Sequence, residues 1–268
     1  MKLVIKSLSL IILTVSLFLN EASSCEFKKD IKVGLYSGAI TELIKHLGLE
    51  EKENIIFYSN YFPINNKSAK ELSGGIFTSK KLLSEYSVDH VFYDDSRELK
   101  LLFERSGFKQ LTAIKTAGMT PFEVVTNNLK VLRPLIKNCG EKIKVLEENI
   151  SKTKKLSLKH KKVIFFLGEL KENKLPELIM LQDGFVKYLL QENLIKSYES
   201  ELAYITWSEK LLNEYIQDNY TLVGLSQSKV VLEIHMVSKN RYNFACNTCL
   251  TPGLGQIKFL NALKDTDF

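Results

Sequence analysis

The sequence predicts an α/β fold of two lobes, each a mostly parallel sheet with flanking helices, joined by a single long interdomain helix. In both halves of the chain, short apolar runs typical of buried strands alternate with amphipathic segments typical of helices. Such alternation favours parallel sheets that are covered by helices on both faces. One long helical pattern lies between the two halves, and it predicts the connection between the lobes.

Residues 1–24 are typical of an export signal. Lys2 and Lys6 precede an apolar run at residues 8–19 that is too short to span a bilayer, and small residues follow at 22–24. The mature chain would begin at Cys25, so we expect a periplasmic or secreted protein. A lipoprotein signal is cleaved at the same bond, and a lipid anchor on Cys25 is the alternative.

The expected N-terminal lobe, residues 25–138, opens with a strand at residues 31–36 and a tight turn at Ser37-Gly38. The helix that follows is apolar at each i, i+3, i+4 and i+7 position from Ile40 to Leu47, and Gly48 ends it. A helix N-terminus beside the carboxyl end of a strand exposes unpaired N–H groups where open α/β folds bind ligands. Further strands are expected at residues 55–58, 90–93 and 111–115, and, in a C-terminal lobe spanning 159–268, at residues 162–167, 220–225 and 230–237.

The long helical pattern has nine apolar positions in alternating steps of three and four. They are Phe122, Val125, Leu129, Leu132, Ile136, Cys139, Ile143, Leu146 and Ile150. Pro134 and Gly140 are expected to break it into one helix that starts at Thr120-Pro121 and an interdomain helix at residues 139–158, about 27 Å long. Two packed helices inside one domain would give the same periodicity.

Four cysteines in an exported chain predict two disulfides, with three possible connectivities. Cys246 and Cys249 have the spacing of a redox motif, but the Pro252-Gly253 turn that follows prevents an immediate helix, whose dipole would lower a cysteine pKa. We therefore expect a structural Cys246–Cys249 bridge, which leaves Cys25 and Cys139 to pair or to remain free. A secreted thiol oxidoreductase is the alternative.

The composition argues against nucleic-acid binding and against catalysis. The formal net charge is +6, but the lysines are dispersed among 31 Asp and Glu residues, as on a solvated surface. The chain lacks GxSxG, GxxxxGK[ST] and HExxH motifs, so we expect a binding protein without a resident cofactor. Its four histidines are scattered, which disfavours a zinc or manganese site; haem needs only one axial ligand, which Tyr61 or Tyr93 can supply.

Several segments, in order along nearly the whole mature chain, resemble periplasmic substrate-binding proteins that serve ABC importers of cobalamin, haem and ferric siderophores. The matching segments are Ile40-Thr41-Glu42-Leu43, Leu47-Gly48-Leu49, Ile55-Ile56-Phe57-Tyr58, Tyr61-Phe62-Pro63, Ser73-Gly74-Gly75-Ile76-Phe77, Val88-Asp89-His90-Val91, the run from Leu132 through Gly140 to Leu146, Ile205-Thr206-Trp207-Ser208-Glu209-Lys210-Leu211-Leu212 and Thr251-Pro252-Gly253-Leu254-Gly255.

The resemblance implies a monomer that captures a chelated iron or tetrapyrrole ligand and delivers it to an ABC permease in the inner membrane. Members of this class dock the permease through one surface glutamate per lobe, because complementary charges set register and on-rate. Glu209 fits the second-lobe position, whereas Lys81 stands at the first-lobe position and Glu85 follows one turn later. Lys81 makes an orphan binding-fold protein a credible alternative, and a zinc or manganese receptor of similar shape is another.

In a two-lobed protein the ligand lies between the lobes, on loops at the carboxyl ends of the strands. The expected ligand-binding residues are Tyr36, Ser37, Tyr61, Phe62, Tyr93, Met119, Glu169, Gln182 and Trp207. Aromatic side chains suit a large ring system because each offers a wide apolar face, and Tyr and Trp keep a polar group. Ordinary core packing is the alternative for each aromatic residue.

Overall fold

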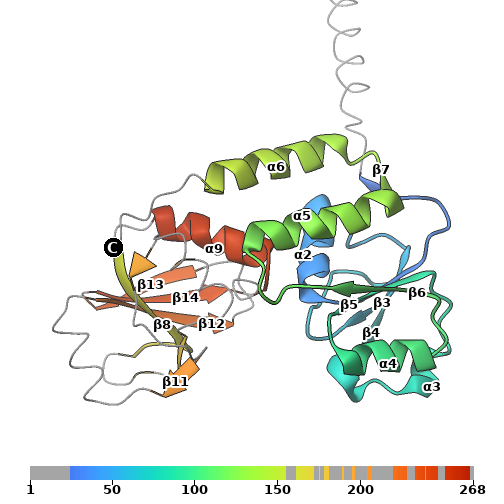
Figure 1. The fold of residues 1–268 in the computed structure, drawn as a ribbon, viewed down its shortest axis with the longest axis horizontal. Coiled ribbons are helices and arrows are strands. Elements are labelled where there is room, and N and C mark those ends of the chain that lie inside the picture. The colour runs from blue at the N-terminus through green and yellow to red at the C-terminus, as the bar shows by residue number, and fades with distance from the viewer. Residues whose placement is uncertain are drawn as a thin grey trace, which may run out of the picture.

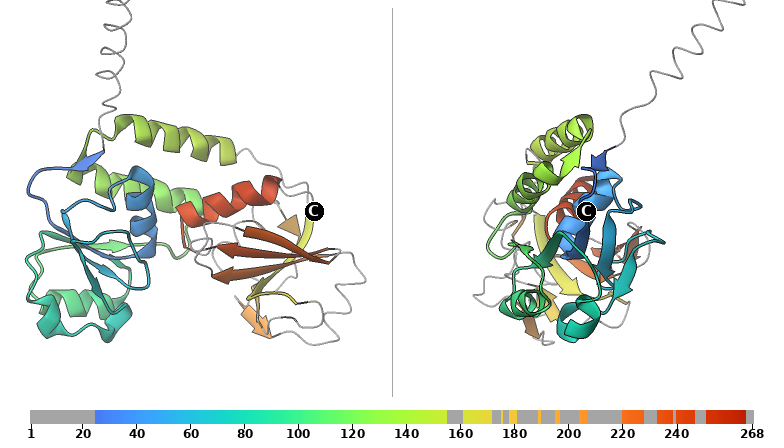
Figure 2. Two further views of the ribbon diagram at one scale, coloured as in Figure 1. Left: turned by 180° about the vertical axis from the view of Figure 1, so that it is seen from behind. Right: turned by 90° about the vertical axis from the view of Figure 1, so that its right-hand side faces the viewer.

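The computed structural model describes residues 25–154, 161–171, 175, 178–180, 189, 195–196, 204–206, 220–227, 233–238, 240–246 and 251–265. Two separate sheets form two lobes, and helices cover them (Figures 1 and 2). The predicted α/β class with parallel sheets and flanking helices is confirmed.

The N-terminal sheet is entirely parallel and has the order β4-β3-β2-β5-β6. Its strands are β2 (Val33–Tyr36), β3 (Ile55–Ser59), β4 (Lys70–Leu72), β5 (His90–Asp94) and β6 (Gln110–Ile114). The sequence predicted all but β4, which has two exposed residues among its three and therefore no apolar run. The strand order reverses direction between β2 and β5, so the topological switch point lies at the carboxyl ends of these two strands.

The C-terminal sheet is mixed, with parallel strands at its centre. Its order is β11-β9-β8-β12-β14-β13, with β10 also on β8; the neighbours β8, β12 and β14 are parallel, whereas β9, β11 and β13 run antiparallel to their partners. The bounds are β8 (Lys161–Leu167), β9 (Leu178–Met180), β10 (Ile195–Lys196), β11 (Tyr204–Thr206), β12 (Thr221–Gln227), β13 (Glu233–Ser238) and β14 (Arg241–Cys246). Ile205 and Thr206, which begin the segment at residues 205–212 that resembles the binding-protein family, lie in strand β11.

Helices lie on both faces of the N-terminal sheet. Helices α2 (Gly38–Leu47) and α5 (Pro121–Leu132) cover one face, and α3 (Lys80–Leu83) and α4 (Arg97–Arg105) cover the other (Figure 1). Gly48 ends α2 in the left-handed conformation with φ of 71°, as the sequence predicts. Thr120 and Glu123 form a capping box at the start of α5.

The nine apolar positions of the long helical pattern are all buried, although the backbone is not one helix. After α5 the chain forms a 3₁₀ turn, η2 (Arg133–Leu135), and a short strand, β7 (Ile136–Lys137), which pairs with β1 (Glu26–Phe27). Helix α6 then spans Gly140–Lys154, and residues 155–158 of the expected interdomain helix lie outside the described residues. A single long helix as the connection between the lobes is not confirmed, because α2, α5 and α9 (Leu254–Asp265) also meet at the junction.

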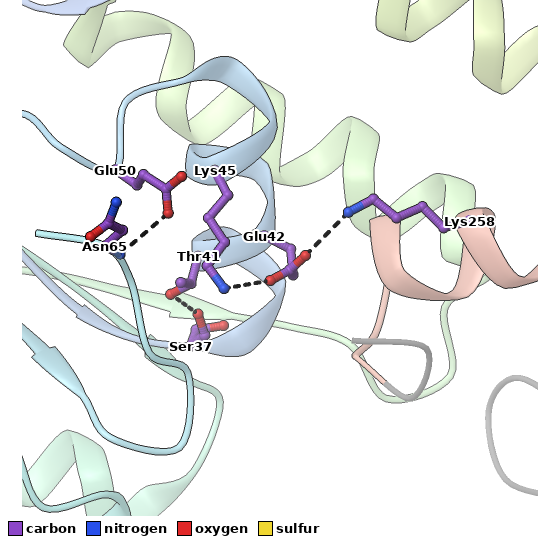
Figure 3. Close-up of polar contacts among 7 residues, drawn as sticks. All are labelled: Ser37, Thr41, Glu42, Lys45, Glu50, Asn65 and Lys258. Atoms are coloured by element: carbon purple, nitrogen blue, oxygen red, sulfur yellow. Dashed lines mark hydrogen bonds and ion pairs between the residues drawn. The ribbon is translucent and has the colours of Figure 1, made fainter. Parts of the chain in front are cut away.

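Helix α2 receives a lysine from each of two helices at this junction. Glu42, whose side chain is 5% exposed, pairs with Lys45 of its own helix at 3.0 Å and with Lys258 of α9 at 3.4 Å (Figure 3). Lys142 of α6 donates to the carbonyl of Leu47 at 2.7 Å. The apolar core is continuous from the N-terminal sheet through these helices to the C-terminal sheet.

A disulfide joins Cys25 to Cys139 across 114 residues, with the Cα atoms 4.4 Å apart. It ties the residue before β1 to the residue before α6, beside the β1–β7 pair. Cys249 lies outside the described residues, so the Cys246–Cys249 bridge stays a prediction.

Replacing Cys139 by Ser is expected to lower the free energy of unfolding by about 3–5 kcal/mol, because the bond closes a loop of more than 100 residues in the unfolded chain. Denaturant unfolding under non-reducing conditions measures this change. The Cys25→Ser, Cys139→Ser double variant is the control and should lose the same amount, since both variants lack one and the same bond. A wild-type midpoint for Cys139→Ser would contradict the assignment.

Candidate functional site

The parallel strands of both sheets end toward the opposite lobe (Figure 1). On the N-terminal side, the segments after β2, β3, β4 and β5 therefore form the edge that a ligand between the lobes would meet. The loop after β8 and the end of β12 form the corresponding edge of the C-terminal lobe.

Three large apolar side chains stand exposed at the N-terminal edge. Tyr61 follows β3, whereas Ile76 and Phe77 belong to the 3₁₀ turn η1 (Gly75–Phe77) that follows β4. They are 53%, 57% and 76% exposed, respectively. We call these three residues, two aromatic rings and the aliphatic Ile76, the aromatic platform. Neighbouring exposed apolar side chains at such an edge are typical of a surface that binds a partner or a ligand.

Glycines let the rings of this edge lie directly on the backbone. A Cβ atom at Gly74 would lie 2.4 Å from the ring of Tyr61, and one at Gly38 would lie 2.6 Å from the ring of Phe62. The two rings meet edge to face, with centroids 6.5 Å apart and planes at 86°. Gly38 is also the first residue of α2, so Phe62 covers the N-terminus of that helix.

Ser37 and Asp94 occupy the switch point between β2 and β5. Ser37 is fully buried, and its Oγ has no hydrogen-bond partner among the described residues. Burial raises the pKa of the Asp94 carboxyl, and the nearby Ser37 hydroxyl partly opposes that rise without reaching hydrogen-bond geometry. The fold thus keeps a buried hydroxyl without a partner among the described residues, beside a half-buried carboxyl, at the place where open α/β sheets bind ligands.

Two of the expected ligand-binding tyrosines lie in the core. Tyr36 and Tyr93 are 2% and 3% exposed and pack with Phe57 and Phe103 under α3 and α4, so neither ring is accessible to a ligand between the lobes. Burial raises the pKa of Tyr36 to about 12, against the effect of its hydrogen bond to Thr78. The pKa of Tyr93 is also raised, first by burial and then by Asp95 and Glu104.

The other expected ligand-binding residues are spread over both edges. Met119 is half-buried before α5, and its Sδ lies 3.5 Å from Nδ2 of Asn127. Glu169 is exposed after β8, with its carboxylate 3.5 Å from the Ser226 hydroxyl on β12. Gln182 and Trp207 lie outside the described residues.

The side-chain amide of Asn243 on β14 positions the loop that carries Glu169. Its Oδ1 accepts from the Leu170 N–H at 2.7 Å, and its Nδ2 donates to the Leu170 carbonyl at 2.8 Å. Gly224 allows this close packing, because a Cβ there would lie 2.7 Å from the Gly168 carbonyl oxygen. The loop after β8 is therefore fixed against the centre of the C-terminal sheet.

Of the residues expected to dock a permease, Lys81 on α3 and Glu85 just after it are exposed, and Glu209 lies outside the described residues. Within the described ranges, no three His, Cys, Asp or Glu side chains gather as metal ligands. None of the helices that the structure describes combines the length and apolar character needed to cross a bilayer. A shallow hollow of about 390 Å³, lined by Asp89, Phe108 and their neighbours, lies at the opposite edge, where β5 and β6 begin.

The sequence analysis did not include Ile76 and Phe77 among the expected ligand-binding residues, and the structure adds them as candidates because they are exposed. The signal was present, because two large apolar residues directly follow the Gly74-Gly75 turn in an otherwise polar stretch. Adjacent apolar residues in a turn have no regular partner face, so exposure is the expected outcome for at least one of them.

No protein-family model and no curated protein sequence matches the chain. Its fold is nevertheless similar to those of several solved structures. The periplasmic haem-binding protein HutB of Vibrio cholerae has a TM-score of 0.63 and 14% sequence identity, over 87% of this chain and 97% of that one. An ABC transporter substrate-binding protein from Listeria monocytogenes has a TM-score of 0.58 and 15% sequence identity, over 88% of this chain and 98% of that one. The periplasmic vitamin B12-binding protein BtuF of V. cholerae has a TM-score of 0.51 and 11% sequence identity, over 72% of this chain and 75% of that one. The chain shares their fold.

Substituting Ala for Gly74 is expected to displace the Tyr61 ring while changing the free energy of unfolding by no more than about 0.5 kcal/mol. The backbone at Gly74 has φ of −73°, which Ala adopts freely, and the ring that must move is exposed. A crystal structure of the variant shows the ring position. Gly140→Ala is the matched control, because a Cβ at Gly140 meets no atom within 4 Å. An unmoved Tyr61 ring would contradict the packing described here.

Asp94→Asn is expected to gain stability relative to the wild type as the pH rises from about 4 to 7. Because the native pKa of Asp94 is raised, its protonated form stabilises the fold at low pH, and that contribution is lost as pH rises through the native pKa. The neutral amide avoids this loss. Thermal melting across this pH range measures it, with Asp95→Asn, which removes the same charge from an exposed neighbour, as the comparison. If the melting temperatures of the two variants changed with pH in the same way, the prediction would be wrong.

Proposed function

We propose that this chain is an extracytoplasmic substrate-binding protein that captures a chelated iron or tetrapyrrole ligand and delivers it to an ABC importer. The ligand would be a ferric siderophore, haem or cobalamin. The observation that carries the proposal is the aromatic platform at the carboxyl edge of the N-terminal sheet in a two-lobed fold. The shared fold with HutB, BtuF and the Listeria transporter protein supports the same role.

The platform suits a large ligand with an apolar face. A buried aromatic side chain removes about 150–250 Å² from water and prefers to stack on flat groups. The ring of Tyr61 rests on the Gly74 backbone and is thereby held before a ligand arrives. Ligand binding by such a surface needs no covalent chemistry, which agrees with a chain that is not an enzyme.

For a haem ligand, the structure favours Tyr61 over Tyr93 as the axial residue. Tyr61 is half exposed at the platform, whereas the Tyr93 ring is buried under α4. A tyrosine oxygen is a known axial ligand of haem iron in proteins. A cobalamin or siderophore would use the Tyr61 ring but not its hydroxyl.

The Cys25–Cys139 disulfide supports secretion without a lipid anchor. Disulfides persist in oxidising compartments, and the export signal at residues 1–24 would deliver the chain to one. The sulfur of Cys25 cannot be in a disulfide and carry a thioether-linked lipid at the same time. We therefore propose a periplasmic or secreted protein that is free of a lipid on Cys25.

Permease docking is proposed through Glu209 on one lobe and the surface of Lys81 and Glu85 on the other. Lys81 is exposed where a glutamate is expected, and a lysine would repel an arginine pocket on a permease. This observation favours, as a second candidate, a binding protein of the same fold whose transporter partner has changed or been lost. Either protein is expected to act as a monomer.

Ligand binding is tested by thermal unfolding with haemin, cyanocobalamin and ferrioxamine. A ligand at 100 times its dissociation constant is expected to add about 2.7 kcal/mol to the free energy of unfolding. Tyr61→Ala should weaken binding of any of the three, because it removes the ring. Tyr61→Phe should abolish the tyrosinate spectrum of bound haemin but leave cobalamin or ferrioxamine binding unchanged. No stabilisation by any of the three would count against the proposal.

A further inference from the structure

The Tyr36 side chain has an apolar part and a polar part with different surroundings. Its ring lies edge-on to Phe57 and Phe103, with centroids 5.9 and 5.1 Å away. Its hydroxyl reaches the chain after β4, where it contacts the Ser73 carbonyl oxygen at 2.8 Å and Thr78 Oγ1 at 2.5 Å. The Thr78 hydroxyl also donates to the Ser73 carbonyl. These three groups form a triangle of polar contacts, in which the two hydroxyl protons make two hydrogen bonds at a time. The Tyr36–Thr78 contact is buried, and the two contacts to the Ser73 carbonyl are partly buried.

The triangle closes the segment that carries Ile76 and Phe77, two of the three residues of the aromatic platform. Ser73 and Thr78 flank Gly74 to Phe77, so linking them fixes both ends of the turn that presents Ile76 and Phe77. Two further hydrogen bonds hold this turn: Oδ1 of Asn60 accepts from the Gly74 N–H at 2.7 Å, and the Phe77 N–H donates to the Gly74 carbonyl at 3.4 Å. Few backbone hydrogen bonds hold this turn, so the side-chain bonds at its ends matter for its order.

Core packing alone does not account for a tyrosine at this position. Phenylalanine has the same ring and would make the same edge-on contacts with Phe57 and Phe103 without burying a hydroxyl. Burying a hydroxyl is unfavourable unless it is hydrogen-bonded, and the partners of this one, Ser73 and Thr78, both belong to the platform segment. The hydroxyl therefore acts on that segment.

We propose that the Tyr36 hydroxyl, together with Thr78, holds the Ile76 and Phe77 side of the platform in its ligand-binding conformation. The sequence led us to expect that Tyr36 contacts the ligand. In this proposal it is a positioning residue, which holds the residues that contact the ligand. The proposal rests on the proposed function for its ligand, but the order of the segment can be measured without one. The raised pKa of Tyr36 agrees with this role, because the hydroxyl keeps its proton throughout the neutral range.

Hydrogen exchange of residues 73–79, followed by mass spectrometry on the ligand-free protein, tests the positioning directly. Tyr36→Phe and Thr78→Val each remove one hydroxyl while keeping the size of the side chain. Both are expected to exchange about fivefold faster in this segment, as the loss of one hydrogen bond of ordinary net strength implies. Unchanged exchange in both variants overturns the proposal.

Two matched variants separate positioning from a general loss of stability. Tyr58→Phe removes another tyrosine hydroxyl of the same lobe, which bonds Glu71 on β4, and should leave the exchange of residues 73–79 unchanged. Thr78→Ser keeps the hydroxyl and should restore protection that Thr78→Val loses. Faster exchange across the whole core under α3 and α4, in place of a change confined to this segment, would show a merely structural role and overturn the proposal.

Affinity for the ligand found among haemin, cyanocobalamin and ferrioxamine is the second readout. Tyr36→Phe should bind about fivefold more weakly than the wild type, and Tyr58→Phe should bind like the wild type. Equal affinity of Tyr36→Phe and the wild type overturns the positioning role while the proposed function stands. If none of the three binds the wild type, faster exchange in Tyr36→Phe still supports the positioning role, and the proposed function alone fails.

Discussion

The packing of helix α2 between the two lobes is the constraint on which the rest of the structure depends. Nearly all of its residues are buried, including the carboxylate of Glu42, which is paired with Lys45 and Lys258. Leaving a buried charge with fewer partners is costly, so the pairing with Lys258 links α9 of the C-terminal lobe to the N-terminal sheet. Because α2 begins at the switch point, fixing this helix also fixes the edge where a ligand would bind.

The charged groups at this junction favour a fixed arrangement of the lobes over a freely hinged one. Lys142 of α6 donates to the last carbonyl of α2. The pKa of His46, whose side chain is exposed, is lowered by partial desolvation and then by the charges of Lys258 and Lys142. A neutral His46 adds no third positive charge beside these lysines. With a continuous apolar core across the same helices, any closure of the lobes on a ligand would be small.

The parts of the fold that depend on local pattern could be predicted, and those that depend on distant contacts could not. Apolar runs predicted strands β2, β3, β5 and β6 of the N-terminal sheet, whereas β4, which has no such run, was missed. The nine positions from Phe122 to Ile150 are all buried because the break at β7 keeps its apolar side on the same core. The burial of the Tyr36 ring under α3 and α4 could not be predicted. Strands that are buried on both faces show no alternation that tells one face from the other. The sequence left open whether Cys25 and Cys139 pair or remain free, because the β1–β7 pairing that lies beside the two cysteines is a contact between distant segments.

The candidate site combines a scaffold that is fixed around α2 with the exposed turn η1, whose two ends are held by hydrogen bonds. Exposing Phe77 and Ile76 to water is unfavourable in the free protein, and burying them against a ligand recovers that free energy. The recovery adds to affinity only if the turn is already ordered, since ordering it during binding would consume part of the gain. The hydroxyls of Tyr36 and Thr78 supply that order from inside the lobe, out of reach of the ligand. If this edge binds a ligand as proposed, its affinity depends on the buried hydroxyls of Tyr36 and Thr78 as well as on the residues that touch the ligand.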